Sequence, residues 1–193
     1  MISPKIIKEI DAIIKETWLK NIQKDYSNLY LLKEDGLKCS FYYHLRRKLA
    51  KLLKEYNLRI YPEFYFAQLG YYADIAIVQI DLESEQNHLK NMVTDVIAVI
   101  ELKYAGGNSK ATEEWIKSDI PKIKNYIQDG KVTCQFYAAF VYETECSYLK
   151  LLDKRSANNW ASGYVTELNA GYLDGKMTFE VNSYNGMNSE YNS

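Results

Sequence analysis

The sequence V-I-A-V-I-E-L-K-Y, residues 96–104, is an apolar run that ends in two opposite charges, Glu101 and Lys103. Its β-branched residues predict a buried strand. Because side chains alternate between the two faces of a strand, we expect Glu101 and Lys103 to point to one side, with Val99 beneath them. Charged side chains are rarely buried without a partner or a functional role. The two charges at the end of this strand therefore indicate a structural or functional site.

Two more strands are predicted upstream, at residues 58–66 and 71–80, because both runs are rich in aromatic and β-branched residues. Asp74 is the one charged residue of the second run. If this run pairs with residues 96–104, two carboxylates on neighbouring strands converge.

Helical spacing of apolar residues predicts the helices. One runs from Pro4 to about Lys24, and a second has an apolar stripe from Leu37 to Tyr56 and stops at Asn57. A third starts near Thr112, and we expect a break before Pro121 and a second piece to about residue 128. Later strands are predicted at 132–142, 164–169 and 177–181, the last two forming a hairpin through Asp174-Gly175.

This order of elements predicts an α/β fold in which helices flank a mixed central sheet. The 193 residues fit one domain, residues 1–193. We expect its core at about 30–145, an N-terminal helix at 1–28, and a C-terminal extension at 146–193 that contains the hairpin.

The composition argues against several classes of site. Cys39, Cys134 and Cys146 are an odd number at wide spacing, which predicts free thiols. Two histidines poorly supply a histidine-rich metal centre or a Ser-His-Asp triad, although one histidine could still serve, and we expect any metal to be held by oxygen. No segment has the apolar length of a membrane span, and we expect a cytoplasmic protein.

The net charge of −1 argues against general binding to nucleic acid, but one local run is basic. Between Lys38 and Lys54 lie six basic residues and no acidic one. The run is compatible with a contact to a phosphate backbone and equally with a solvated helix face.

Asp74 and Glu101, together with the Leu102 carbonyl, make the hard-oxygen ligand set that Mg²⁺ or Mn²⁺ prefers. A metal on carboxylates stabilises charge on a phosphate and aligns a water for phosphodiester hydrolysis. Lys103 would orient that water, lower its pKa, or bind a nonbridging oxygen, and the sequence leaves these three roles open.

These residues resemble the signature of the PD-(D/E)xK nuclease superfamily, whose fold is restriction-endonuclease-like. The signature has an Asp on one strand and Glu-x-Lys on the next, here Asp74 and Glu101-Leu102-Lys103. The resemblance covers roughly residues 34–142 and implies a Mg²⁺-dependent core of helix, three strands, helix and strand. Two departures are Ala73, where the signature has proline, and the position of Asp74 inside its strand.

Many members of this superfamily also carry a Glu on the upstream helix, which Glu34 matches. Glu34 lies on the inward stripe if the helix extends back through Gly36, and otherwise it is a solvated acid at the helix N-terminus. Glu63 on the preceding strand is the rival accessory carboxylate. Asp119 with Lys122 resembles a polar pair that some members carry on the next helix.

The three-residue motif is weak alone, because an acid-x-Lys string is expected about once by chance in a chain this charged. Asp129-Gly130-Lys131 and Asp174-Gly175-Lys176 have the same spacing on Asp-Gly turns. Of the three strings, Glu101-Leu102-Lys103 is the one that ends an apolar strand and has an acidic residue in the strand before it.

Two functions follow as hypotheses. The first is a metal-dependent nuclease, with DNA favoured over RNA as the substrate and with catalytic residues Glu34, Asp74, Glu101 and Lys103. The second is an idle nuclease-like fold that acts as a binding, immunity or regulatory module. The oligomeric state is left open, a homodimer included.

Overall fold

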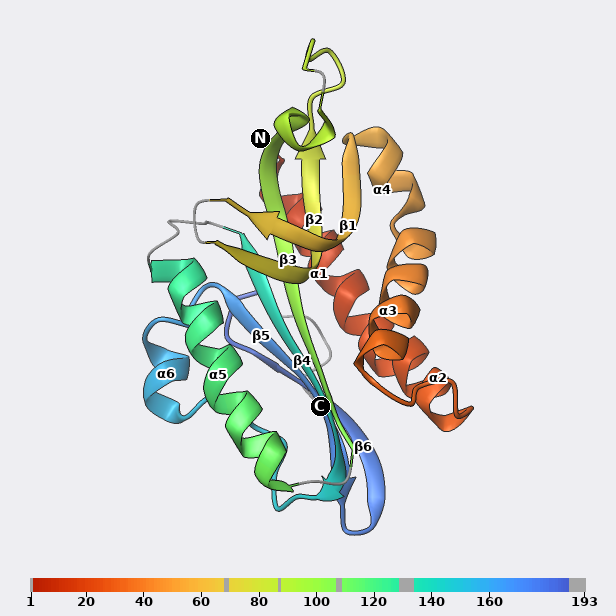
Figure 1. The fold of residues 1–193 in the computed structure, drawn as a ribbon, viewed down its shortest axis with the longest axis vertical. Coiled ribbons are helices and arrows are strands. Elements are labelled where there is room, and N and C mark those ends of the chain that lie inside the picture. The colour runs from red at the N-terminus through yellow and green to blue at the C-terminus, as the bar shows by residue number, and fades with distance from the viewer. Residues whose placement is uncertain (1, 68–69, 87, 107–108, 129–133, 188–193) are drawn as a thin grey trace.

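The fold is built on one six-stranded mixed sheet in the order β1-β2-β3-β4-β5-β6 (Figure 1). The computed structural model describes residues 2–67, 70–86, 88–106, 109–128 and 134–187, with 109–117 described by their backbone. The strands are β1 Leu58–Phe66, β2 Tyr71–Ile80, β3 Val93–Ala105, β4 Gln135–Glu145, β5 Val165–Leu173 and β6 Lys176–Ser183. The strands β1, β2 and β3 are antiparallel, β3, β4 and β5 are parallel, and β6 is antiparallel to β5. The predicted α/β class with a mixed sheet is confirmed.

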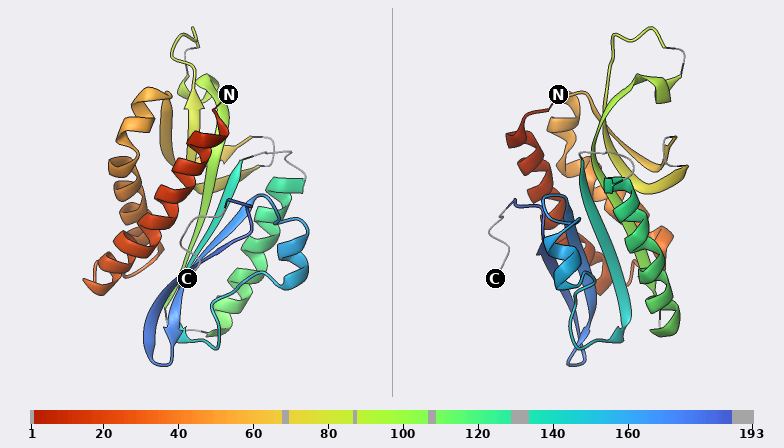
Figure 2. Two further views of the ribbon diagram at one scale, coloured as in Figure 1. Left: turned by 180° about the vertical axis from the view of Figure 1, so that it is seen from behind. Right: turned by 90° about the vertical axis from the view of Figure 1, so that its left-hand side faces the viewer.

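Helices cover both faces of the sheet (Figure 2). They are α1 Pro4–Glu16, α2 Gln23–Ser27, α3 Glu34–Lys48, α4 Ala50–Glu55, α5 Ser109–Gln128 and α6 Lys154–Asn158, with a π-helix at Thr17–Ile22 and a 3₁₀ helix at Leu89–Met92. The π-helix joins α1 to α2, so helical backbone runs to Ser27, slightly beyond the expected end.

Two apolar cores lie on opposite faces of the sheet. The larger contains α1 and α3 with Ile100 and Leu102 of β3, and the other contains Tyr126 of α5 with Val99. From Val99 onward, β3 therefore alternates between the two faces. Glu101 belongs to the same face as Val99, toward α5, as the period of two predicts.

Several helix ends differ from expectation. The predicted second helix is divided at Leu49 into α3 and α4, and Asn57 ends it in a left-handed conformation (φ 53°). The predicted break before Pro121 is wrong, because α5 continues through it. Burial of Ile123 and Tyr126 against the sheet outweighs the backbone hydrogen bond that a proline removes.

The C-terminal region belongs to the sheet itself. β5 pairs in parallel with β4, and β6 returns through a turn at Asp174 and Gly175, both with positive φ (50° and 71°). The predicted hairpin is therefore confirmed, but it extends the central sheet. The Asp129-Gly130-Lys131 turn and the predicted strand start at residue 132 lie outside the described residues. Among the helices described, none is both long and apolar enough to cross a membrane.

Candidate functional site

The candidate site lies where β2 and β3 separate. Their antiparallel pairing ends at Ile75 and Ile100, so Asp74 and Glu101 occupy the next facing positions. Beyond this point β2 pairs with β1 alone, and the β1–β2 hairpin turns away from β3 (Figure 1). The predicted proximity of the two carboxylates follows directly from this register.

A distortion of β1 accompanies this separation. Glu63, opposite Asp74, lies between the paired residues Pro62 and Phe64 and has a positive φ of 49°. Such a conformation is strained for a residue other than glycine, and strain of this kind is concentrated at functional sites. Pro62 adds a residue without an N–H at the same bend.

Asp74 is bound on both of its oxygens. Oδ2 accepts a hydrogen bond from the Leu102 N–H at 2.8 Å, and Oδ1 lies 2.8 Å from Lys38 Nζ. In a strand, the N–H and C=O of one residue point toward the same neighbour. The Leu102 carbonyl therefore also points to the Asp74 side, past the end of the β2–β3 pairing.

Glu101 is the most buried acid of the site, with 3% of its surface exposed. Oε2 lies 2.7 Å from Lys122 Nζ, whereas Oε1 is buried and forms no hydrogen bond of standard geometry with the described chain. The Tyr126 hydroxyl is close enough to the Glu101 carboxyl that, together with burial, this carboxyl raises the pKa of Tyr126. Burial raises the pKa of this carboxyl to about 8, against the opposing effect of Lys122. The nearby charges of Asp74 and Asp119 raise it further, which places all three acids within electrostatic reach of one another.

Lys103 links the two helices that flank the site. Its Nζ lies 3.3 Å from Glu34 Oε2 at the first turn of α3 and 3.5 Å from Asp119 Oδ2 on α5. Burial alone would lower the pKa of Lys103, but the charges of Asp119 and Glu34 outweigh burial and raise it. The Lys103 ammonium group therefore stays protonated and positively charged at neutral pH.

Lys38 is the residue of this site that sequence reasoning missed as a partner of Asp74. Its ammonium group contacts both Asp74 and Glu63, and these hydrogen bonds overcome burial and raise its pKa. A signal was present in the sequence, since Lys38 follows Glu34 by one helical turn and so lies on the same stripe. Both rival accessory acids reach the network, Glu34 through Lys103 and Glu63 through Lys38.

Lys122 connects α5 to the β1–β2 hairpin, which turns away from β3. Besides Glu101, its Nζ donates to the Tyr72 carbonyl at 2.8 Å, and the Tyr126 hydroxyl contacts the same carbonyl at 3.4 Å. The backbone oxygen of Tyr72, for which β3 no longer supplies a partner, is thus bound by side chains.

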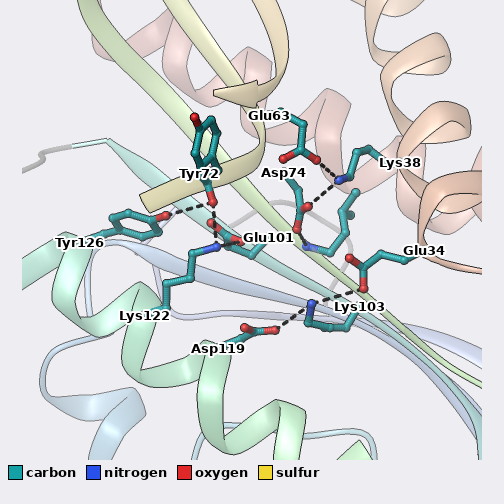
Figure 3. A network of polar contacts seen from close by, with 11 residues as sticks. Glu34, Lys38, Glu63, Tyr72, Asp74, Glu101, Lys103, Asp119, Lys122 and Tyr126 are labelled. Atoms are coloured by element: carbon teal, nitrogen blue, oxygen red, sulfur yellow. Dashed lines mark hydrogen bonds and ion pairs between the residues drawn. The ribbon is translucent and has the colours of Figure 1, made fainter. Parts of the chain in front are cut away.

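Figure 3 shows these side chains between α3 and α5 as a network that consists of three sets of ion pairs, one around each lysine. In the described chain, its ion pairs join five acids to three lysines, which are Glu34, Glu63, Asp74, Glu101 and Asp119 with Lys38, Lys103 and Lys122. Acidic groups exceed basic ones by two, so the centre attracts cations when all groups are ionised. His44 instead binds Asp25 at 2.9 Å, outside this network, and the three cysteines are free, as predicted.

The donor set partly fits a divalent cation. The described residues contain no group of three or more Asp, Glu, His or Cys side chains arranged to hold a metal, and a lysine pairs with each of the two central carboxylates. Glu101 nevertheless has a buried oxygen without a hydrogen bond in the described chain, and it occupies the strand position facing Asp74. Carboxylate oxygens of this kind are hard donors that suit Mg²⁺ or Mn²⁺. Such an ion would also offset the excess of negative charge that results from five acids and three lysines.

Comparisons with known proteins found no match: no family model, no curated protein and no solved structure is significantly similar to this chain.

Proposed function

We propose that the protein is a metal-dependent nuclease in which Asp74, Glu101 and the Leu102 carbonyl hold Mg²⁺ or Mn²⁺. The observation that carries the proposal is the facing placement of Asp74 and Glu101, with one buried Glu101 oxygen that forms no hydrogen bond of standard geometry with the described chain. Buried carboxylate oxygens are normally hydrogen-bonded, so an unpartnered one calls for an additional ligand.

We also propose that the fold is restriction-endonuclease-like. In support, α3, the antiparallel strands β1, β2 and β3, helix α5 and the parallel strand β4 follow one another in the order of that core. Asp74 lies on the second of these strands and Glu101-Leu102-Lys103 on the third.

The chemistry required is attack of water on a phosphodiester. A divalent cation, when bound, would stabilise negative charge on the phosphate and lower the pKa of a coordinated water. Lys103 supplies a second positive charge, and its raised pKa favours donating hydrogen bonds to a water or a nonbridging oxygen over accepting a proton. Lys122 and Lys38 hold the Glu101 and Asp74 carboxylates in position.

Cleavage assays with matched variants test this function. Purified protein is incubated with plasmid and linear DNA in Mg²⁺ or Mn²⁺, next to Lys103→Met and the control Lys176→Met. Lys176 belongs to the Asp174-Gly175-Lys176 string of identical spacing on an exposed turn. We expect loss of cleavage in Lys103→Met and wild-type cleavage in Lys176→Met, whereas equal activity in both would refute the assignment.

The proposed substrate is DNA in preference to RNA, on the resemblance to restriction endonucleases alone. Parallel assays with DNA and RNA oligonucleotides of one sequence decide between them. Faster cleavage of RNA would change the substrate and leave the site assignment intact.

A second candidate function is an idle nuclease-like fold that serves as a binding, immunity or regulatory module. The observation in its favour is that lysines already pair with both central acids, Lys38 with Asp74 and Lys122 with Glu101. An idle fold of this kind predicts no change of melting temperature with Mn²⁺. The nuclease predicts a rise that depends on Glu101.

A further inference from the structure

A basic groove lies outside the acidic network, between β1 and the helices α3 and α4. It encloses about 450 Å³. Its polar lining consists of Tyr42, Arg46, Lys54, Arg59 and Tyr61, and apolar residues complete it. No Asp or Glu is among the lining residues of this groove in the part of the chain that is described. The groove therefore presents positive charge and phenol groups together.

The cations of this groove are available to a ligand. Arg46 lies over the Tyr42 ring, 5.6 Å from its centroid, and donates to the Tyr42 hydroxyl at 3.2 Å. Arg59 donates to the Leu58 carbonyl at 2.7 Å. Within the described ranges, none of Arg46, Lys54 and Arg59 forms an ion pair, in contrast to the three lysines of the acidic site.

Two elements connect this groove to the acidic site. Along α3, Lys38, Tyr42 and Arg46 follow at intervals of four residues and so share one stripe. Along β1, Tyr61 of the groove precedes Glu63 by two residues, and Glu63 forms an ion pair with Lys38 of α3. Arg46 is about two turns, or about 12 Å, from Lys38 along the helix axis, which equals the rise of three or four base pairs along the axis of B-form DNA.

We infer that this groove binds the phosphate backbone of a nucleic acid strand whose scissile phosphate lies near Asp74 and Glu101, an inference that rests on the proposed function. With all of its acids ionised, the site has an excess of negative charge that repels a polyanion, so we expect cations outside the site to supply the binding free energy. Arg, Lys and Tyr are the side chains that contact phosphates, and the groove supplies all three.

Fluorescence anisotropy in EDTA tests this subsite without any metal. A short labelled oligonucleotide, single- or double-stranded, is titrated with wild-type protein, with Arg46→Gln/Lys54→Gln/Arg59→Gln, and with the control Lys150→Gln/Lys154→Gln/Arg155→Gln. The control removes three exposed cations near α6. We expect the groove variant to bind at least about tenfold more weakly and to lose about 2 in the salt slope of log K, with the control near wild type.

Circular dichroism melting of both triple variants shows that each is folded under the assay conditions. Equal affinity of the groove variant and the wild type, or an equal loss in both triple variants, would overturn the inference. Displacement of the oligonucleotide by polyglutamate of the same total charge, at the same concentration, would also overturn it, because the groove would then accept any polyanion. Groove-dependent binding without cleavage in Mg²⁺ or Mn²⁺ would instead refute the proposed nuclease and the placement of a scissile phosphate, and would support the binding of a phosphate backbone in the groove.

Discussion

Asp74, one residue beyond the last β2–β3 pair, accepts on its carboxylate a hydrogen bond at 2.8 Å from the N–H of Leu102, two residues beyond that pair. A side chain thus replaces a strand partner at the point where the sheet opens. The contact fixes Asp74 beside Glu101 and directs the Leu102 carbonyl toward the same space. The separation of β2 from β3 is therefore what creates the site.

Asp74→Asn tests the charge at this position while keeping an oxygen for the Leu102 N–H. We expect DNA cleavage to fall by about 100-fold or more, because a ligand charge is lost where negative charge on phosphate must be stabilised. The control is Asp174→Asn, at a turn with positive φ that Asn tolerates. Rates of plasmid nicking measure both variants, and similar rates would contradict the role of Asp74.

Glu101→Gln tests the raised pKa of the buried carboxyl. The pKa of Glu101 in the folded protein, about 8, lies above its ordinary value of 4.5, so the folded state keeps a proton that the unfolded chain has released between these values. The stabilising contribution of Glu101 is therefore full below about pH 4.5 and is lost as the pH rises to about 8. The Gln variant should gain stability relative to the wild type over this range, by at least about 1 kcal/mol.

Urea unfolding in EDTA at pH 5 and pH 9 measures this difference. The exposed Glu9→Gln serves as the control and should show no comparable gain. A constant difference between Glu101→Gln and the wild type at the two pH values would show that Glu101 is ionised throughout.

Metal affinity should rise with pH, since a cation must displace the proton of Glu101. Below the pKa of about 8, each unit of pH is expected to raise the apparent affinity about tenfold. The rise in melting temperature at fixed Mg²⁺ concentration, measured at pH 6.5 and pH 8.5, reports this dependence. An equal rise in melting temperature at both pH values would show that the metal does not bind through the Glu101 carboxylate.

A buried ion pair fastens α1 to the C-terminal part of the chain. Lys15 Nζ lies 2.6 Å from Asp11 Oδ2, and Asp11 Oδ1 accepts from the Tyr137 hydroxyl at 2.8 Å and from Asn185 Nδ2 at 2.9 Å. Lys15→Met leaves a buried carboxylate without its cation and should cost about 3–5 kcal/mol of unfolding free energy. Lys20→Met removes the exposed partner of Glu16 and should cost about 0–1 kcal/mol. Comparable losses in urea unfolding would contradict this difference.

Much of the site was predictable because strand periodicity is a local property. The bounds of β1 and β2 agree with the predicted runs 58–66 and 71–80, where aromatic and β-branched residues are dense. The predicted convergence of Asp74 and Glu101 follows from the pairing of β2 with β3. The metal, the reaction and the family resemblance stay predictions.

What the sequence could not reveal depends on long-range packing. The continuity of α5 through Pro121 is decided by burial of Tyr126 against the sheet. The parallel pairing of β5 with β4 joins segments that are distant in the sequence. Lys38 binds both Asp74 and Glu63, and the positive φ of Glu63 could not be read from the sequence because no glycine stands at this position.

The central claim is that Asp74 and Glu101 share one divalent cation, and electron paramagnetic resonance of free Mn²⁺ tests it most directly. Titration at pH 8 should show about one Mn²⁺ bound per wild-type chain and loss of that binding in both Asp74→Asn and Glu101→Gln, as expected for a shared ligand pair. Mn²⁺ binding that is absent from the wild type, or unchanged in both variants, would contradict the account.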